Sequence, residues 1–130
     1  MLEGLDHVQL AMPPGGEERA RACFGRLLGL VEIEKLAALA GRGGVWFGLR
    51  DGRQIHLGVE EPFRPNEKAH PAFSCATLED LALRLEEGGY AVRWDEALPV
   101  GGSTVRTLSG TGWSLSSRSL LRPDIMPLTS

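Results

Sequence analysis

The sequence predicts an α+β fold in which two β-α-β-β-β units form a curved mixed sheet around a cup-shaped cavity. Several short segments alternate apolar and polar residues, as strands do, while two longer segments carry apolar residues at helical spacing. The order of strands and helix begins again after about sixty residues, which is typical of an internal duplication. The length of 130 residues is that of one domain. We therefore expect a single domain with a first unit at residues 5–60, a second at 69–117 and a tail at 118–130.

The first unit is predicted to open with a strand and a helix. Apolar and polar residues alternate from Leu5 to Met12, and Pro13-Pro14 ends this strand. From Glu17 to Leu28 small and apolar residues recur at intervals of three and four, which indicates one buried helical stripe, and Gly29 ends the helix. Glycine-containing turns separate three further predicted strands, at Leu30–Lys35, Val45–Leu49 and Gln54–Val59.

The second unit repeats this order after a loop that contains prolines. A strand is predicted at His70–Ala76, and Thr77 followed by Asp80 indicates the start of a helix. Gly88-Gly89 ends this helix, and a strand is predicted at Ala91–Trp94.

Composition and charge exclude several classes of function. The net charge of −3 lacks the surplus of Lys and Arg that binding to nucleic acid requires, and anionic membranes are excluded for the same reason. No apolar run reaches the length of a membrane helix and no signal peptide is recognisable, so a cytoplasmic location is expected. Cys23 and Cys75 are far apart and outside any C-x-x-C pattern, so both are interpreted as small core residues.

All three histidines of the protein fall in predicted strands, on the face opposite the main apolar one. His7 lies in the first strand, His56 in the fourth and His70 in the first strand of the second unit. Neutral imidazoles from separate strands can bind a divalent metal, with water or substrate oxygens completing its coordination. The alternative is that each histidine is a polar residue on a half-exposed strand, and the pattern alone does not decide between the two.

The motifs resemble those of the glyoxalase/bleomycin-resistance/extradiol-dioxygenase group, the vicinal oxygen chelate superfamily. The resemblance runs from Leu5 to about Pro99 and rests on the order and spacing of L-D-H-V-Q-L, A-R-A-C-F-G-R-L-L-G-L, Q-I-H-L-G-V and A-H-P-A-F. It implies that the metal-ligand positions of the family fall on His7, His56 and His70.

The resemblance also implies an activity, a cofactor and a partner. A divalent ion, whether Fe, Zn, Ni or Mn, would act as Lewis acid on two neighbouring oxygens of a small substrate, and lyase, isomerase and dioxygenase reactions all fit. The alternative is a small-molecule binder without catalysis, like the bleomycin-resistance members. A homodimer is expected by analogy, and no residue is assigned as general base.

The end of the chain departs from the family pattern. The family supplies a further metal ligand, a Glu on the last strand, after a D-P-x-G-N turn, and neither is present here. From Ala97 to Ser130 there are eleven Ser and Thr residues but one acid, Asp124. Synonymous codons for Gly102 to Ser114 can be chosen so that another frame gives F-Y-G-P-D-P-L-G-N-R-L-E, which is the missing ending.

Two hypotheses follow for this segment. The first is that it is frameshifted relative to its relatives. The second is an ordinary divergent tail, in which Val105, Trp113 and Leu115 still form strands and Ser114 stands near the position of the Glu. Either way the loss of a carboxylate ligand would weaken a metal site and impair activity. The last strand is expected to pair poorly, and Leu120–Ser130 to be a loose extension.

Weaker signals concern the substrate. Gln9 shares the strand face of His7, Trp46 is either a wall of the cup or a core residue, and Arg50 could attract an anionic substrate or simply be solvated. The segment Gly41–Gly44 lacks the lysine and hydroxyl of a phosphate-binding loop and indicates a turn.

Overall fold

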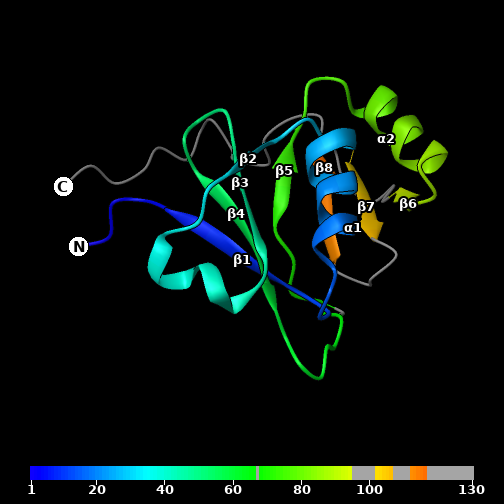
Figure 1. The fold of residues 1–130 in the computed structure, drawn as a ribbon. Coiled ribbons are helices and arrows are strands. Elements are labelled where there is room, and N and C mark those ends of the chain that lie inside the picture. The colour runs from blue at the N-terminus through cyan, green and yellow to red at the C-terminus, as the bar shows by residue number, and fades with distance from the viewer. Residues whose placement is uncertain (67, 95–101, 107–111, 117–130) are drawn as a thin grey trace.

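The protein folds into two units that each form one open four-stranded sheet (Figure 1). In this computed structural model, residues 1–66, 68–94, 102–106 and 112–116 are described. The predicted α+β class and the repeated β-α-β-β-β plan are confirmed. Within the described ranges, no helix is long and apolar enough to cross a membrane.

The first sheet has the strand order β1-β4-β3-β2. Its strands are β1 (His7–Met12), β2 (Val31–Ile33), β3 (Val45–Gly48) and β4 (Gln54–Val59). β1 runs parallel to β4, and the other two pairings are antiparallel. A first strand that pairs with the fourth leaves β1 and β2 as the edges of the sheet.

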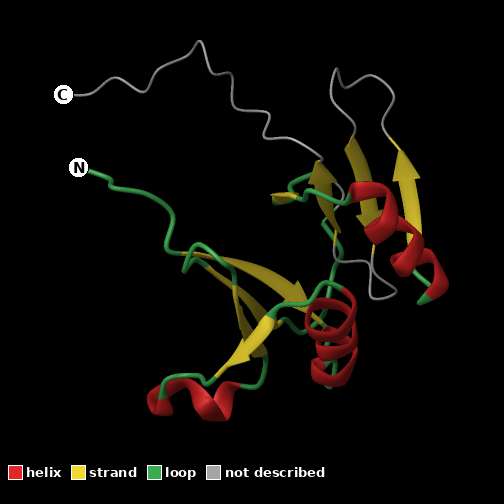
Figure 2. Ribbon diagram, turned by 90° about the horizontal axis from the view of Figure 1, so that it is seen from above, coloured by secondary structure: helices red, strands yellow, loops and turns green. Residues whose placement is uncertain are grey.

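One continuous helical segment covers one face of this sheet. It begins as α1 (Glu17–Ala20) and continues as the wider π-helical η1 (Arg21–Leu27). The amide of Leu28 donates to the carbonyl of Cys23, five residues back, which closes the wider turn. Figures 1 and 2 show this helix between the first sheet and the second unit, and η1 contacts β2, β3 and the second helix.

A short 3-10 helix, η2 (Ala37–Arg42), connects β2 to β3 and was not expected from the sequence. It ends at Gly43 and Gly44, which both have positive φ. The Glu17 carboxylate accepts a hydrogen bond from the Gly44 amide at 3.1 Å, and the Lys35 ammonium donates to the Gly43 carbonyl. The turn that leads into β3 is therefore held to the start of α1.

The second sheet repeats the topology of the first, with the order β5-β8-β7-β6. Its strands are β5 (Ala72–Ser74), β6 (Ala91–Trp94), β7 (Gly102–Arg106) and β8 (Gly112–Ser116), and α2 (Leu78–Glu87) follows β5. Thr77 stands at the N-cap position but makes no side-chain hydrogen bond to the helix, since its hydroxyl lies 3.8 Å from the sulfur of Cys75 instead. Poor pairing of the last strand was a wrong expectation, because β8 pairs with both β5 and β7.

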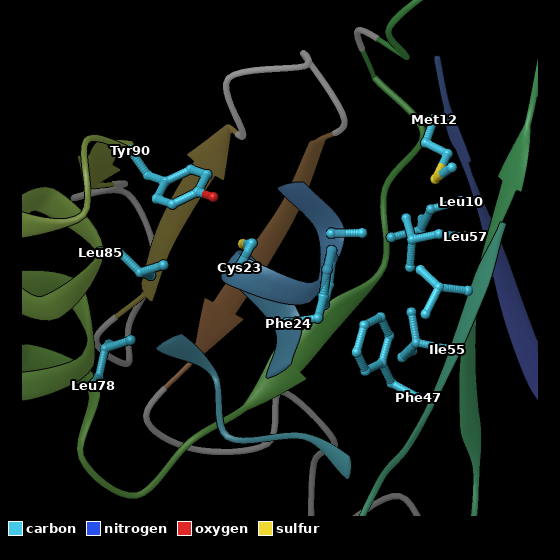
Figure 3. Close-up of a cluster of buried hydrophobic side chains, with 12 residues drawn as sticks. Leu10, Met12, Cys23, Phe24, Phe47, Ile55, Leu57, Leu78, Leu85 and Tyr90 are labelled. Carbon is cyan, nitrogen blue, oxygen red and sulfur yellow. The ribbon is translucent and has the colours of Figure 1, made fainter. Parts of the chain in front are cut away.

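One hydrophobic core joins the two units (Figure 3). The ring of Phe24 on η1 stacks on Phe47 of β3, with ring centroids 5.7 Å apart. On the other side of η1, the Cys23 thiol and the Tyr90 hydroxyl are hydrogen bonded. The expected tail at 118–130 lies outside the described residues.

Candidate functional site on the open face of the first sheet

The face of the first sheet turned away from α1 and η1 carries the polar residues. Val8, Leu10 and Met12 pack into the core, so alternation along β1 directs His7 and Gln9 to the opposite face. In the register of the sheet, Gln9 is paired with His56 and His56 with Trp46. The predicted orientation of His7 and His56 away from the core is thus reproduced.

Three rings from three strands stack on this face. The indole of Trp46 lies parallel to the His56 imidazole, with ring centroids 3.8 Å apart and an interplanar angle of 0°. The opposite side of the His56 ring faces His7, at 4.1 Å and 15°. We call Trp46, His56 and His7 the ring stack; its spacing is that of direct face-to-face contact.

His56, in the middle of the ring stack, is buried. Only 5% of the residue is exposed, which disagrees with the alternative interpretation of His56 as a polar residue on a half-exposed strand. Its Nε2 lies 2.8 Å from Oε1 of Gln54, so this nitrogen donates to the amide oxygen. Burial, and then the neighbouring His7, lower the pKa of His56, because both disfavour the charged imidazolium.

The other two histidines are exposed, and in each the Nδ1 atom is hydrogen bonded to an oxygen. Nδ1 of His7 lies 2.9 Å from a carboxylate oxygen of Asp6, and Nδ1 of His70 lies 2.7 Å from the carbonyl oxygen of Lys68. Each Nδ1 therefore donates, which leaves Nε2 with its lone pair. A carboxylate or backbone carbonyl behind an imidazole is the usual support of a metal-ligating histidine.

The structure does not bring all three histidines together within one chain. His70 lies two residues before β5 in the second unit, whereas the predicted strand began at His70. Among the described residues, no group of three or more His, Cys, Asp or Glu side chains could hold a metal ion. The three-histidine ligand set therefore stays a prediction.

The register of the second sheet places Ser114 at the position equivalent to His56. Gln9, two residues after His7, pairs with His56; Ala72, two residues after His70, pairs with Ser114. The expected position of the family's glutamate on the last strand is thus a central position of the second sheet, and a serine stands there.

A pocket of about 410 Å³ lies next to the ring stack at the β2 edge of the sheet. Trp46 and Ile33 form one wall, and Ala37 and Ala40 of η2 another. Its charged residues are Arg21, Glu32, Glu34 and Lys35, of which Arg21 and Glu32 form an ion pair at 2.9 Å. Sequence reasoning missed these residues because η2 was not anticipated.

The three residues expected to bind substrate have different positions. Trp46 is half-buried and lines the pocket. Gln9 is exposed and its side chain lies over Gly58, where an added Cβ would come within 2.7 Å of the Gln9 amide nitrogen. Arg50 is exposed in the turn between β3 and β4 and is not part of the pocket lining.

The donor chemistry fits a divalent metal at His7 and His70 taken separately. Both have a supporting acceptor on Nδ1, which favours the neutral tautomer whose lone pair is on Nε2. A neutral imidazole is a suitable ligand for Mn, Fe, Ni and Zn, and its lone pair is directed in the ring plane. The two residues belong to different units, and among the described residues of one chain neither is part of a group of three or more possible metal ligands.

Paired β-α-β-β-β units with a histidine at the start of each are the architecture of the vicinal oxygen chelate superfamily, and solved structures of that superfamily share the fold. One is a mutant of the fosfomycin resistance protein FosX from Listeria monocytogenes, crystallised with Mn(II) and dihydroxypropylphosphonic acid. It has a TM-score of 0.73 and 15% sequence identity, and the alignment covers 92% of this chain and 94% of that chain. A glyoxalase/dioxygenase from Nostoc punctiforme has a TM-score of 0.71 and 19% identity over 88% and 90%.

A third structure is similar in sequence as well. A Bacillus anthracis protein assigned to the glyoxalase family has a TM-score of 0.83 and 38% identity, and the alignment covers 89% of this chain and 95% of that chain. This chain belongs to the glyoxalase family. No protein-family model and no curated protein matches it.

Proposed function

We propose that the chain is a metal-dependent enzyme that acts on a small molecule with two neighbouring oxygens, as a lyase, isomerase or dioxygenase. The observation that supports it most directly is that His7 and His70 each expose Nε2 while Nδ1 is fixed by an acceptor. When bound at such nitrogens, a divalent ion supplies Lewis acidity toward substrate oxygens. A FosX relative binds Mn(II), which makes Mn(II) the first ion to test.

The site would be assembled by two copies of the chain. His7 of one copy and His70 of a second would face each other, since the two histidines are in different units and the described residues of one chain form no group of three or more possible ligands. Several apolar side chains outside the core, including Val31 and Trp94, are exposed and available for such contact. We therefore propose a homodimer that acts in the cytoplasm.

The residues of the chain itself would bind and orient the substrate. Trp46 offers an apolar wall at the pocket, and Gln9 offers an amide beside the ring stack. Asp6 and the Lys68 carbonyl keep the protons on the Nδ1 atoms, so that the Nε2 atoms stay available as donors of electron pairs.

A mixing experiment tests this site. His7→Phe and His70→Phe proteins should each bind no Mn(II) in calorimetry, while the two variants unfolded together and refolded as a mixture should regain one site in every mixed dimer. Recovery occurs only if each site takes one histidine from each copy. The proposal fails if wild-type protein takes up no Mn(II), Zn(II), Ni(II) or Fe(II), and the shared site fails if the mixture stays inert.

The second candidate is a small-molecule binder without catalysis. It is favoured by the serine at position 114, where the family has a carboxylate. If the protein binds a vicinal diol, diketone or phosphonate with the same affinity in the presence and absence of EDTA, binding does not need a metal. That result would support a binding protein without catalysis.

A further inference from the structure

We infer that His56 is not a metal ligand: it is a positioning residue whose stacked ring orients the neighbouring His7 imidazole. The inference rests on the proposed metal site. It departs from the family-based expectation, in which His7 and His56 share one ion. The ring stack and the hydrogen bond to Gln54 carry the argument.

The geometry of stacking excludes a shared ion. The lone pair of an imidazole nitrogen lies in the ring plane, and the planes of His7 and His56 are only 15° apart with centroids separated by 4.1 Å. An ion midway between two such rings would be displaced from both planes by nearly the whole length of a metal–nitrogen bond, which is about 2.0–2.1 Å. Lone pairs that run side by side cannot converge on one ion.

One nitrogen of His56 is also committed elsewhere. Nε2 donates to Gln54 at 2.8 Å, so it has no lone pair for a metal. One face of the ring is covered by Trp46 and the other by His7, which leaves 5% of the residue exposed. A ligand needs an open approach to a nitrogen, and His56 has little.

The same contacts show what His56 does. Trp46 is its direct cross-strand partner, and both side chains arise from the two central strands of the first sheet. His7 arises from the edge strand β1 and stacks on the outer side of His56. The stack fixes the plane of the His7 ring, and Asp6 fixes its rotation within that plane. Together they aim Nε2 of His7 outward.

The test compares rings with and without nitrogen. His56→Phe keeps a flat ring between Trp46 and His7, His56→Ala removes it, and His7→Phe is the control that removes a proposed ligand. We expect the Mn(II) dissociation constant of His56→Phe to stay within about threefold of wild type, and that of His56→Ala to rise about 10–100-fold, the usual effect of losing a supporting group around a metal ligand. His7→Phe should abolish binding. Thermal melting confirms that each variant is folded.

Two spectroscopic measurements complete the test. Pulsed EPR of the Mn(II) form counts the imidazoles coordinated to the ion, and we expect two. Three coordinated imidazoles would overturn the inference. So would a His56→Phe variant that binds Mn(II) as weakly as His7→Phe does. NMR of the metal-free protein should show upfield-shifted ring protons of His7 in wild type and His56→Phe, but not in His56→Ala. If the ring protons of His7 are unshifted in wild type, the stack does not exist and the inference is wrong. If wild type keeps the shifts but binds no metal, the proposed function and the ligand role of His7 are wrong, while the stacking of His56 on His7 still holds.

Discussion

At the scale of single residues, the two cysteines lie in different surroundings. Cys23 is 2% exposed, and burial raises the pKa of its thiol to about 12, an effect that the hydrogen bond with Tyr90 partly offsets. Cys75, expected to be a core residue, is half-buried next to Thr77. Since the thiolate is the reactive form, the difference in burial should be visible as a difference in rate.

We therefore predict that an alkylating reagent at pH 8 modifies Cys75 in the native protein and leaves Cys23 intact until the chain unfolds. Mass spectrometry after iodoacetamide treatment gives the two occupancies. Cys75→Ser should remove the fast reaction, and rapid labelling of Cys23 in that variant would contradict the burial of its thiol.

Also at this scale, the carboxylate of Glu17 links α1 to the turn before β3. Its pKa is lowered, mainly because the Gly44 amide donates to the ionised form. A carboxyl group whose pKa is lower in the folded state stabilises the protein above its unfolded pKa, and this contribution disappears as pH falls through the folded value.

Glu17→Gln should accordingly lower the free energy of unfolding at pH 7 by about 0.5–1 kcal/mol, because the amide oxygen of Gln can still accept from the Gly44 amide but without the negative charge that strengthens the bond. The gap between wild type and variant should begin to close as pH falls below the unfolded pKa of a glutamate and should vanish once pH is below the lower pKa of Glu17 in the folded state. Urea unfolding at pH 7, 5 and 3 measures it. Glu18→Gln is the matched neighbour, and an equal, pH-independent loss in both variants would refute the role of Gly44.

At the scale of elements, α2 is attached to the core by one face. Leu78, Ala82 and Leu85 are buried, whereas Leu83 is 56% exposed. Leu85→Ala should lower the free energy of unfolding by about 2–5 kcal/mol, because it leaves a cavity in a site that is 0% exposed. Leu83→Ala should change it by about 0.5 kcal/mol or less. Similar losses in the two variants would show that α2 is not packed as described.

The elements that could be predicted are those whose pattern is local. Gln54–Val59 and Ala91–Trp94 coincide with β4 and β6, and the helix expected at Glu17–Leu28 is observed as α1 and η1. Periodicity could not reveal the π-helical geometry, or η2 within an Ala- and Leu-rich connection. β7 and β8 were expected only around Val105, Trp113 and Leu115, because their composition is unlike that of the rest of the chain.

The candidate site shows the same division between local and long-range information. Alternation correctly gave the face of His7 and His56, since it depends on neighbours in sequence. The burial of His56 could not be derived, because it requires Trp46 and His7 to lie on either side of it in the sheet register. The distance of His70 from this pair depends on how the two units pack, which no local pattern encodes.

At the scale of the whole molecule, the core cluster contains residues of both units, from Leu10 to Tyr90. A common core makes the two units unfold together. In hydrogen exchange, Leu85→Ala should therefore lower the free energy of opening of the β4 amides, in the other unit, by as much as that of the α2 amides. Unchanged protection in β4 would mean that the units unfold independently.

The composition of the chain end calls for a test at the level of the gene. We predict that the codons for Gly102 to Ser114 carry F-Y-G-P-D-P-L-G-N-R-L-E in another frame. Gene sequencing checks this directly, and codons incompatible with that string would leave ordinary divergence as the explanation. A restored-frame protein should bind Mn(II) more tightly, since a carboxylate would replace Ser114.

The position of β8 in the middle of its sheet has a consequence for biosynthesis. Within the part of the chain that the structure describes, the strand paired with β5 is β8, whose first residue is 112, so this backbone partner is missing while the ribosome is still making the preceding stretch. The first sheet is complete once Val59 has been added. A nascent chain can thus form its first unit early, whereas the second sheet stays open until β8 has been made, and termination before β8 would leave β5 as an unpaired edge prone to association.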